Sequence, residues 1–258
     1  MILKPHVFAD KYVPEELWHR DRELAQVLRV LSPVVQGQSS RTLLISGPAG
    51  SGKTALVQTA FAGKNADAAV PSAVVSVRGQ ATPEILRQLL SQHPEADSEA
   101  GTQSQAALAD QLDEVISAPY TVVLDDAGTH HTQEVLAVLQ AVGPIGIVVV
   151  GRTHDSWLSA HPHEHHEDGI EHHVRCRAYT RSELADILEQ RAVRGVELGC
   201  WSRPTLERIA ARADGNAACA IRLFKMTLRL AAQRDHETVR RVDIADATIE
   251  VSESTAPH

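Results

Sequence analysis

The chain has 258 residues and a formal net charge of −8, with 33 acidic against 25 basic residues. This length suits one large domain or a large domain with an appendage. Apolar residues make up 43% of the chain and charged residues 22%, which is typical of a globular protein and excludes a disordered one. The acidic balance argues against a uniformly basic nucleic-acid coat, although not against a local basic patch. Aromatic residues amount to only 3%, so we expect an aliphatic core.

The cysteines and the apolar runs bear on the compartment. Cys176, Cys200 and Cys219 show no paired spacing, which favours free thiols in a reducing environment. The first ten residues, MILKPHVFAD, lack the apolar core of a signal peptide. The longest apolar run, residues 145–150, is too short to span a bilayer. We therefore expect a cytoplasmic protein with no membrane partner.

The first part of the chain alternates between helical and strand patterns. Apolar residues spaced at i, i+3, i+4 and i+7 predict an amphipathic helix over residues 24–31, ended by Pro33 and Gly37. Thr82 is the expected cap of a later helix with Pro83 in its first turn, and residues 93–105 are expected to form a surface loop. Short apolar runs predict buried strands at 43–45, 73–77, 121–124 and 145–150. Strands that alternate with helices indicate an α/β fold with a parallel sheet covered on both faces.

After about residue 178 the pattern becomes helical. Capping signals at Thr180, Ser202 and Asn216 open three expected helices, and Val242 and Ile244 mark a short fourth one. We expect no strand in this part, and the polar C-terminal end should be frayed. The expected divisions are an α/β nucleotide-binding domain over 1–178, a helical lid domain over 179–250 and a disordered tail over 251–258.

Charge is distributed unevenly along the chain. Residues 174–241 hold 14 Arg and Lys against eight Asp and Glu, a net charge of +6. The rest of the chain therefore carries −14, so the mean acidity hides a strong asymmetry.

The strongest motif lies between a predicted strand and a predicted helix. Residues 47–54 read GPAGSGKT and match G-x-x-x-x-G-K-[ST] in full. The glycines let backbone N–H groups face an anion, and the following helix points its positive end at the same place. Lys53 would supply positive charge to the β and γ phosphates, and Thr54 a hydroxyl to Mg²⁺. The motif predicts binding of ATP or ADP with Mg²⁺. The expected nucleotide-contacting residues of this loop are Gly47, Pro48, Ala49, Gly50, Ser51, Gly52, Lys53, Thr54 and Ala55.

Two acids follow the apolar run 121–124. Asp125 is expected to hold the Mg²⁺ water shell, so that Asp125 and Thr54 form the metal site. Asp126 stands where hydrolysing enzymes use a carboxylate to orient the attacking water, but it is one methylene shorter than the usual Glu. The alternative is a strand-ending turn with solvated acids. Nucleotide binding is therefore predicted, and a slow ATPase activity is left open.

Residues 12–24, YVPEELWHRDREL, resemble the entry motif of archaeal origin-recognition and cell-division-cycle (Orc/Cdc-type) replication initiators, a family of AAA+ ATPases. The resemblance continues through GPAGSGKT, VLDD, the segment YTRSELADILEQR at 179–191 and DGNA at 214–217. It implies an AAA+ P-loop NTPase core with a five-stranded parallel sheet, followed by a small all-α lid. Residues that would border the base are Val13, Pro14, His19 and Arg20. The alternative for residues 12–24 is a loop whose apolar side chains simply pack on the core.

Three positions depart from the family's pattern. The polar residue after the fourth strand is usually Asn, and here His154 or Thr153 stands there. The position of the family's lid arginine holds Ala218, and residues 161–173 offer only histidines and acids where an intersubunit arginine is usual. Each departure removes a charge that would stabilise the transition state. The resemblance thus implies a slow or inactive ATPase that still switches on binding. Its expected catalytic residues are Lys53, Asp125, Asp126 and His154.

The function implied by the resemblance is a nucleotide-dependent switch that acts on origin DNA or on other AAA+ initiator subunits. Family members continue into a winged-helix DNA-binding domain, for which we expect no room in this chain. The remaining basic candidates, Arg222, Lys225 and Arg229, share one helix face, and the alternative is that this face is merely solvated. The alternative functions are a regulatory or adaptor P-loop protein without ATPase activity or DNA binding, and a truncated signal-transducing P-loop ATPase.

Six histidines and four acids gather within residues 161–173. This composition could bind Zn²⁺ or Ni²⁺, although the spacing matches no standard site and a loop is expected there. The other interpretation is a group of imidazoles that changes charge near neutral pH.

Overall fold

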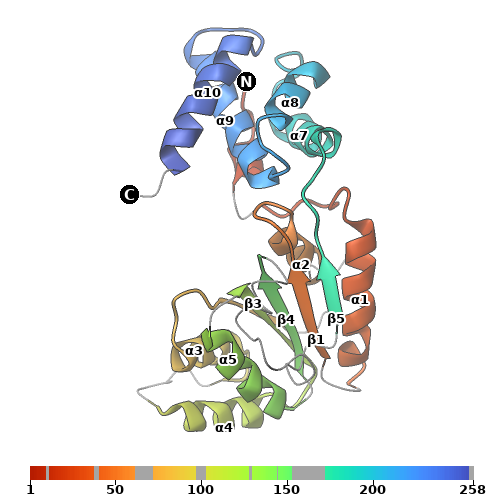
Figure 1. Cartoon of the computed structure of the whole chain (residues 1–258), viewed down its shortest axis with the longest axis vertical. Coiled ribbons are helices and arrows are strands. Elements are labelled where there is room, and N and C mark those ends of the chain that lie inside the picture. The colour runs from red at the N-terminus through yellow and green to blue at the C-terminus, as the bar shows by residue number, and fades with distance from the viewer. Residues whose placement is uncertain are drawn as a thin grey trace. The chain divides into compact units, whose positions relative to one another are not determined.

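The computed structural model describes two compact units of the chain (Figure 1). The sheet unit consists of residues 20–47 and 53–176, and the lid unit of residues 1–19, 48–52 and 177–258. The domain limits expected from the sequence stay predictions, and the lid unit takes in two early segments that the sequence patterns did not assign to it. Described residues are 1–9, 12–37, 41–61, 72–96, 103–127, 130–143, 145–152 and 172–255.

The sheet unit is built on five parallel strands in the order β2-β3-β4-β1-β5. This arrangement confirms the α/β fold and the five-stranded sheet of a P-loop NTPase core. Nearly continuous apolar runs form the central strands because both faces of a parallel sheet are buried. The strands are β1 (Arg41–Ser46), β2 (Ser72–Ser76), β3 (Tyr120–Ala127), β4 (Ile145–Gly151) and β5 (His172–Arg175).

Helices cover both faces of this sheet. Alternate strand residues such as Leu44, Val122 and Ile147 pack into one aliphatic cluster with α3, α4 and α5. Helix α1 contacts β1, β3, β4 and β5, where the remaining buried strand residues lie. The expected aliphatic core is thus present. The helices of this unit are α1 (Asp21–Val35), α2 (Lys53–Phe61), α3 (Thr82–Gln92), α4 (Gln105–Val115) and α5 (His130–Ala141).

Several local expectations need correction. Helix α1 continues past Pro33, which sits in its last turn, and ends at Val35, shortly before the expected Gly37. The cap of α3 is Ala81, one residue before the expected Thr82, and the Thr82 hydroxyl instead donates to Glu134 at 2.7 Å. Helix α4 begins at Gln105, the last residue of the expected loop, and was not predicted.

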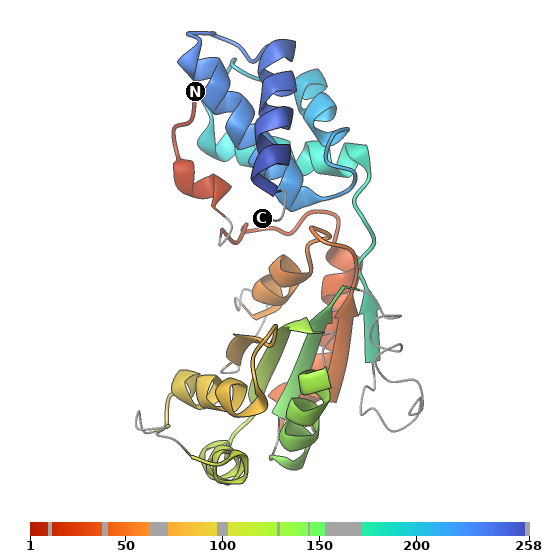
Figure 2. The ribbon, with the colours of Figure 1, turned by 60° about the vertical axis from the view of Figure 1, so that its left-hand side comes forward.

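The lid unit is helical throughout its C-terminal part, as expected (Figure 2). Its core includes Phe8 from the N-terminal segment and Phe224 from α9, whose rings meet edge to face with centroids 5.7 Å apart. Helix α10 runs to Thr255 and buries Val251, so the tail expected from residue 251 begins too early. The helices of the lid unit are η1 (Pro5–Phe8), α7 (Arg181–Gly195), α8 (Arg203–Ala210), α9 (Ala217–Gln233) and α10 (Arg241–Thr255).

In the described part of the chain no helix is both long and apolar enough to cross a membrane. The three cysteines are free of disulfides, as expected.

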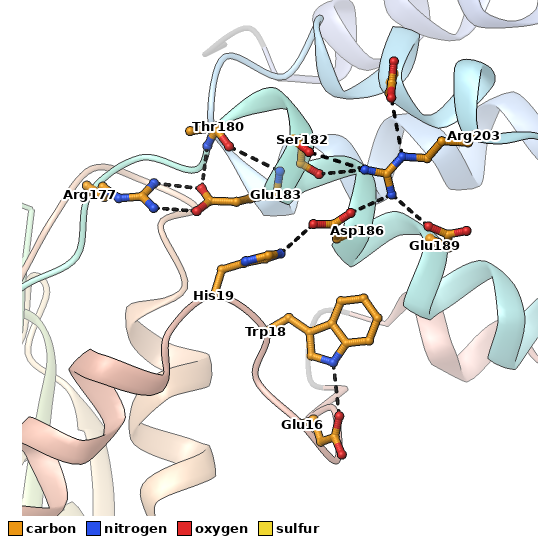
Figure 3. A network of polar contacts seen from close by, with 11 residues as sticks. Glu16, Trp18, His19, Arg177, Thr180, Ser182, Glu183, Asp186, Glu189 and Arg203 are labelled. Atoms are coloured by element: carbon orange, nitrogen blue, oxygen red, sulfur yellow. Dashed lines mark hydrogen bonds and ion pairs between the residues drawn. The ribbon is translucent and has the colours of Figure 1, made fainter.

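Two expected caps are confirmed. Asn216 accepts the backbone N–H of Cys219 at the start of α9. At the start of α7, the Thr180 hydroxyl accepts the N–H of Glu183, and the Glu183 carboxylate accepts the N–H of Thr180 at 2.8 Å. Arg177 also donates to Glu183 at 2.7 Å (Figure 3). These hydrogen bonds, chiefly the one from Arg177, lower the pKa of Glu183 to about 2.

The low pKa of Glu183 predicts a pH-dependent contribution to stability. A carboxylate whose pKa falls on folding stabilises the protein above its unfolded pKa of about 4.5, and the stabilisation is lost as the pH falls toward 2. We expect Glu183→Gln to lower the free energy of unfolding by about 1 kcal/mol at pH 7, with the difference from wild type shrinking between pH 4.5 and 2. Urea unfolding at pH 7, 4 and 3 measures this, with Glu237→Gln as an exposed control. A difference that stays constant with pH would contradict the assignment.

Candidate functional site

The phosphate loop follows β1 and leads into α2, the strand–loop–helix context that the motif requires. Its glycines Gly50 and Gly52 have φ angles of 68° and 86°, in the left-handed region that favours glycine. Within the sheet unit, Gly47 donates its N–H to the carbonyl of Arg152 at 3.0 Å. Lys53 donates its Nζ to the carbonyl of Gly47 at 2.8 Å. The lysine therefore lies back along the loop, and its ammonium group is held beside the end of β1.

The charge environment of Lys53 is mixed. Burial lowers the pKa of Lys53 and the neighbouring charge of Arg152 lowers it further, whereas Asp125 and Asp126 act in the opposite direction. The buried Cys176 thiol has its pKa raised to about 11 by desolvation, so it is neutral at pH 7. An added anion near Lys53 would relieve the cost of this burial by pairing with the ammonium group. Arg152 is a neighbour of Lys53 that sequence reasoning did not select.

The predicted metal residues lie together at the carboxyl end of the sheet. The Thr54 hydroxyl donates to Asp125 Oδ2 at 3.2 Å. The strand β3 shifts register between Leu124 and Ala127, so the two acids sit in an irregularity of the ladder. Asp126 has a φ of 57° and donates its N–H to Asp125 Oδ1 at 2.8 Å. The hydroxyl and carboxylate oxygens of Thr54 and Asp125 are the hard donors that Mg²⁺ prefers, with phosphates and water completing its shell. These two residues therefore fit the expected ion.

The central part of the phosphate loop belongs to the lid unit and contacts the first turn of α9. The carbonyl of Gly50 accepts the N–H of Ala217 at 3.0 Å. A Cβ at Gly50 would lie 1.8 Å from Oδ1 of Asn216, and a Cβ at Gly52 would lie 2.4 Å from the hydroxyl of Tyr179. A side chain at Gly50 or Gly52 would therefore require Asn216 or Tyr179 to move, in addition to the strained backbone. The sequence had marked Asn216 and Tyr179 as a cap and a boundary, and gave no sign that they touch the loop.

The entry segment residues that the resemblance placed near the base lie in the lid unit, apart from Arg20. Pro14 is buried and Val13 is 37% exposed. His19 has a φ of 63°, and its Nε2 lies 2.8 Å from Oδ2 of Asp186 on α7 (Figure 3). Arg20 belongs to the sheet unit, where its side chain is fully buried and its Nη1 lies 3.5 Å from Glu23. Contact of His19 and Arg20 with the base of a nucleotide remains a prediction.

The contact at His19 is part of a larger ionic network (Figure 3). Asp186 also pairs with Arg203 of α8 at 2.6 Å, and Arg203 pairs with Glu189 of α7 at 2.8 Å. The network links the entry segment to α7 and α8 within the lid unit. Because His19 is part of this network, a group that contacts His19 would also affect the contacts of α7 and α8.

Some expected site residues fall outside the described part of the chain. These are His154, Thr153 and residues 161–171 with their histidines. The last two histidines of that group, His172 and His173, lie on β5 and not in the expected loop, and Ser46 Oγ lies 2.7 Å from Nε2 of His173. Ala218, at the position of the family's lid arginine, is exposed in the first turn of α9. Among the described residues no group of three potential metal ligands comes together.

Comparison with known proteins agrees with this architecture. The family model described as "AAA ATPase domain" matches residues 16–150. The ORC1-type DNA replication protein 9 of Halobacterium salinarum is 24% identical over 251 residues, covering 94% of this chain and 69% of that protein. Among solved structures, Cdc6p from Pyrobaculum aerophilum has a TM-score of 0.86 at 20% identity, covering 97% of this chain and 72% of the other. The Aeropyrum pernix ORC1 protein in complex with DNA has a TM-score of 0.80 at 24% identity, covering 98% and 72%. The sequence-based resemblance to archaeal Orc/Cdc-type proteins is thereby confirmed.

Proposed function

Because this chain belongs to the AAA ATPase domain family, we propose that it binds ATP or ADP with Mg²⁺ and acts as a nucleotide-dependent switch of the replication-initiator type. The observation that carries the proposal is the phosphate loop between β1 and α2, with Thr54 bonded to Asp125 beside it. Mg²⁺ would supply positive charge that neutralises the phosphates. Thr54 and Asp125 would hold it, Lys53 would release the Gly47 carbonyl to pair with a phosphate, and the loop N–H groups would face the remaining oxygens.

The catalytic part of the proposal is a weak or absent hydrolysis. Asp126 is exposed and placed by an irregular strand end, where its short side chain is poorly suited to orient an attacking water. Ala218 supplies no charge at the lid position. Loss of one such preorganised charge costs on the order of 10²–10³ in rate. We therefore propose that nucleotide binding, and not turnover, sets the state of the protein.

We propose origin DNA or another initiator subunit as the target of the switch. Relatives are named as ORC1-type DNA replication proteins, and one similar structure is an ORC1 protein in complex with DNA. Helix α9 carries Arg222, Lys225 and Arg229 spaced by three and four residues, and Arg222 and Arg229 are exposed. This basic face is where the proposed DNA contact begins, because phosphate charges are attracted to it without regard to sequence.

DNA binding is tested by fluorescence anisotropy of a labelled duplex at 50–200 mM salt, with ATP, with ADP and without nucleotide. We expect log affinity to fall linearly with log salt, with a slope of about −0.9 for each phosphate neutralised, and the affinity to differ between nucleotide states. A chain that binds no duplex at 50 mM salt with ATP present would instead support the adaptor function.

Turnover is tested by phosphate release at saturating ATP. We expect a rate that is indistinguishable from that of Lys53→Ala, or at least about a hundredfold below the 1–100 s⁻¹ that is typical of kinases. Turnover within the typical range would contradict the binding-only switch.

A further inference from the structure

Three arginines of the lid unit line one cavity of about 350 Å³. Arg208 lies in the last turn of α8, Arg212 just beyond its end, and Arg241 at the first position of α10. The buried side chain of Ile244 is the fourth lining residue. The volume is about ten times the roughly 30 Å³ that one water occupies, so the cavity can admit a group larger than a bound water.

These three arginines have no acidic partner among the described residues, as is also true of Arg191, Arg222, Arg229 and Arg240 in the same unit. Arg177, Arg194, Arg203 and Arg234 each pair with a carboxylate. Over the described residues, no carboxylate lies within ion-pair distance of the three cavity guanidinium groups. Three positive charges beside one cavity would attract an anion to it.

The cavity is set on fixed elements. Asp243, whose side chain is fully buried, accepts the backbone N–H of Arg240 and a hydrogen bond from Arg234, each at 2.9 Å. It also lies 2.9 Å from His236, so the start of α10 is tied down directly beside Arg241. Arg212 donates to the carbonyl of Arg208 at 3.1 Å. The backbone beside Arg241 and the side chain of Arg212 are therefore held in place, which reduces the entropy that these parts lose on binding.

We propose that this cavity binds a phosphate group, supplied by the backbone of duplex DNA. One arginine satisfies a carboxylate with two parallel hydrogen bonds, whereas three arginines around one cavity can donate to the larger set of acceptor oxygens on a phosphate. The choice of DNA as the source of the phosphate rests on the proposed function, and the phosphate site itself does not.

The test compares two triple variants of the full chain that remove the same charge. One is Arg208→Gln/Arg212→Gln/Arg241→Gln, and the matched control is Arg22→Gln/Arg29→Gln/Arg78→Gln, three exposed arginines of the sheet unit. Anisotropy with a labelled duplex at 50–200 mM salt gives affinity and salt slope. We expect the cavity variant to lose at least about tenfold in affinity and about one unit of salt slope, as for one phosphate contact. We expect the control variant to lose less than about threefold. An equal or larger loss in the control variant would overturn the proposal.

A charge-conserving variant separates the effect of arginine geometry from the effect of charge, and it serves as a control for misfolding of the Gln variant. Arg208→Lys/Arg212→Lys/Arg241→Lys keeps the field but loses the planar fork, so we expect an affinity between those of wild type and the Gln variant. Circular dichroism and unfolding midpoints show whether each variant is folded. Affinity equal to wild type in the Lys variant would reduce the cavity to a non-specific positive charge and overturn the site.

Titrations with pyrophosphate and with an acidic peptide distinguish failure of the phosphate site from failure of the proposed DNA function. If wild type binds no duplex, the proposed DNA function fails, and calorimetric titration with pyrophosphate then tests the cavity alone. Binding by wild type that the Gln variant loses would keep the phosphate site and reject DNA as its source, whereas equal binding by both would reject the site. Tighter binding of polyglutamate than of duplex would reject phosphate in favour of an acidic protein partner.

Discussion

Lys53→Ala should reduce the affinity for ATP by about 10- to 100-fold, since a hydrogen bond to a charged group contributes about 1.5–3 kcal/mol. The Lys53 ammonium group donates to the Gly47 carbonyl, and burial lowers its pKa. A phosphate would give it a stronger, charge-assisted partner. The variant has no group to offer in that place, and the rest of the loop would still bind through backbone N–H groups.

Adenosine provides the internal comparison for this variant, because it lacks phosphates. We expect wild type and Lys53→Ala to bind adenosine equally, while their affinities for ATP separate. Calorimetry with both ligands measures this, with Lys4→Ala as a control that removes the same charge from an exposed position in the lid unit. Equal ATP affinity in wild type and Lys53→Ala would contradict the assignment of the phosphate loop.

Sequence reasoning succeeded where one local pattern decides the structure. Apolar runs and glycine spacing predict β1, the GPAGSGKT loop and α2. The caps at Thr180 and Asn216 were predicted because these side chains bond the backbone of their own helix. It failed at α4, where Leu108 and Leu112 at i and i+4 were the available signal but lay next to a polar stretch. It also failed at Thr82, whose hydroxyl bonds Glu134 from another helix.

Features formed by distant segments could not be predicted from spacing. The contact of Asn216 and Tyr179 with the phosphate loop joins residues more than 120 positions apart. The convergence of Arg208, Arg212 and Arg241 depends on how α8 and α10 pack, although each arginine is visible in the sequence. The basic excess of residues 174–241 was the available signal, but a count of charges does not tell which basic residues come together in the fold. These contacts come from tertiary packing, which the spacing of apolar residues within one helix or strand does not predict.

The phosphate loop and the cap of α9 are coupled by Gly50, and this coupling predicts a large loss of stability. Gly50 has a φ of 68°, which costs a residue with a side chain about 1–2 kcal/mol. In Gly50→Ala the new Cβ would also lie 1.8 Å from Oδ1 of Asn216, which caps α9 through the Cys219 N–H at 2.9 Å. Moving Asn216 away gives up that cap, a loss of about 1 kcal/mol. We expect Gly50→Ala to lower the free energy of unfolding by about 2–3 kcal/mol, as measured by urea unfolding.

Two further variants separate the backbone cost from the clash. Gly199→Ala in the same unit has a φ of 90° but no atom within 4 Å of the added Cβ, so it should show the backbone cost alone. Asn216→Ala should cost about 1 kcal/mol by itself, but nothing further when added to Gly50→Ala, because the cap is already lost there. Unfolding energies of the double variant that equal the sum of the single ones would show that the two residues do not interact. Non-additivity of about 1 kcal/mol would instead show that the shape of the phosphate loop and the capping of α9 depend on each other, which is the link a nucleotide bound at the loop would act on.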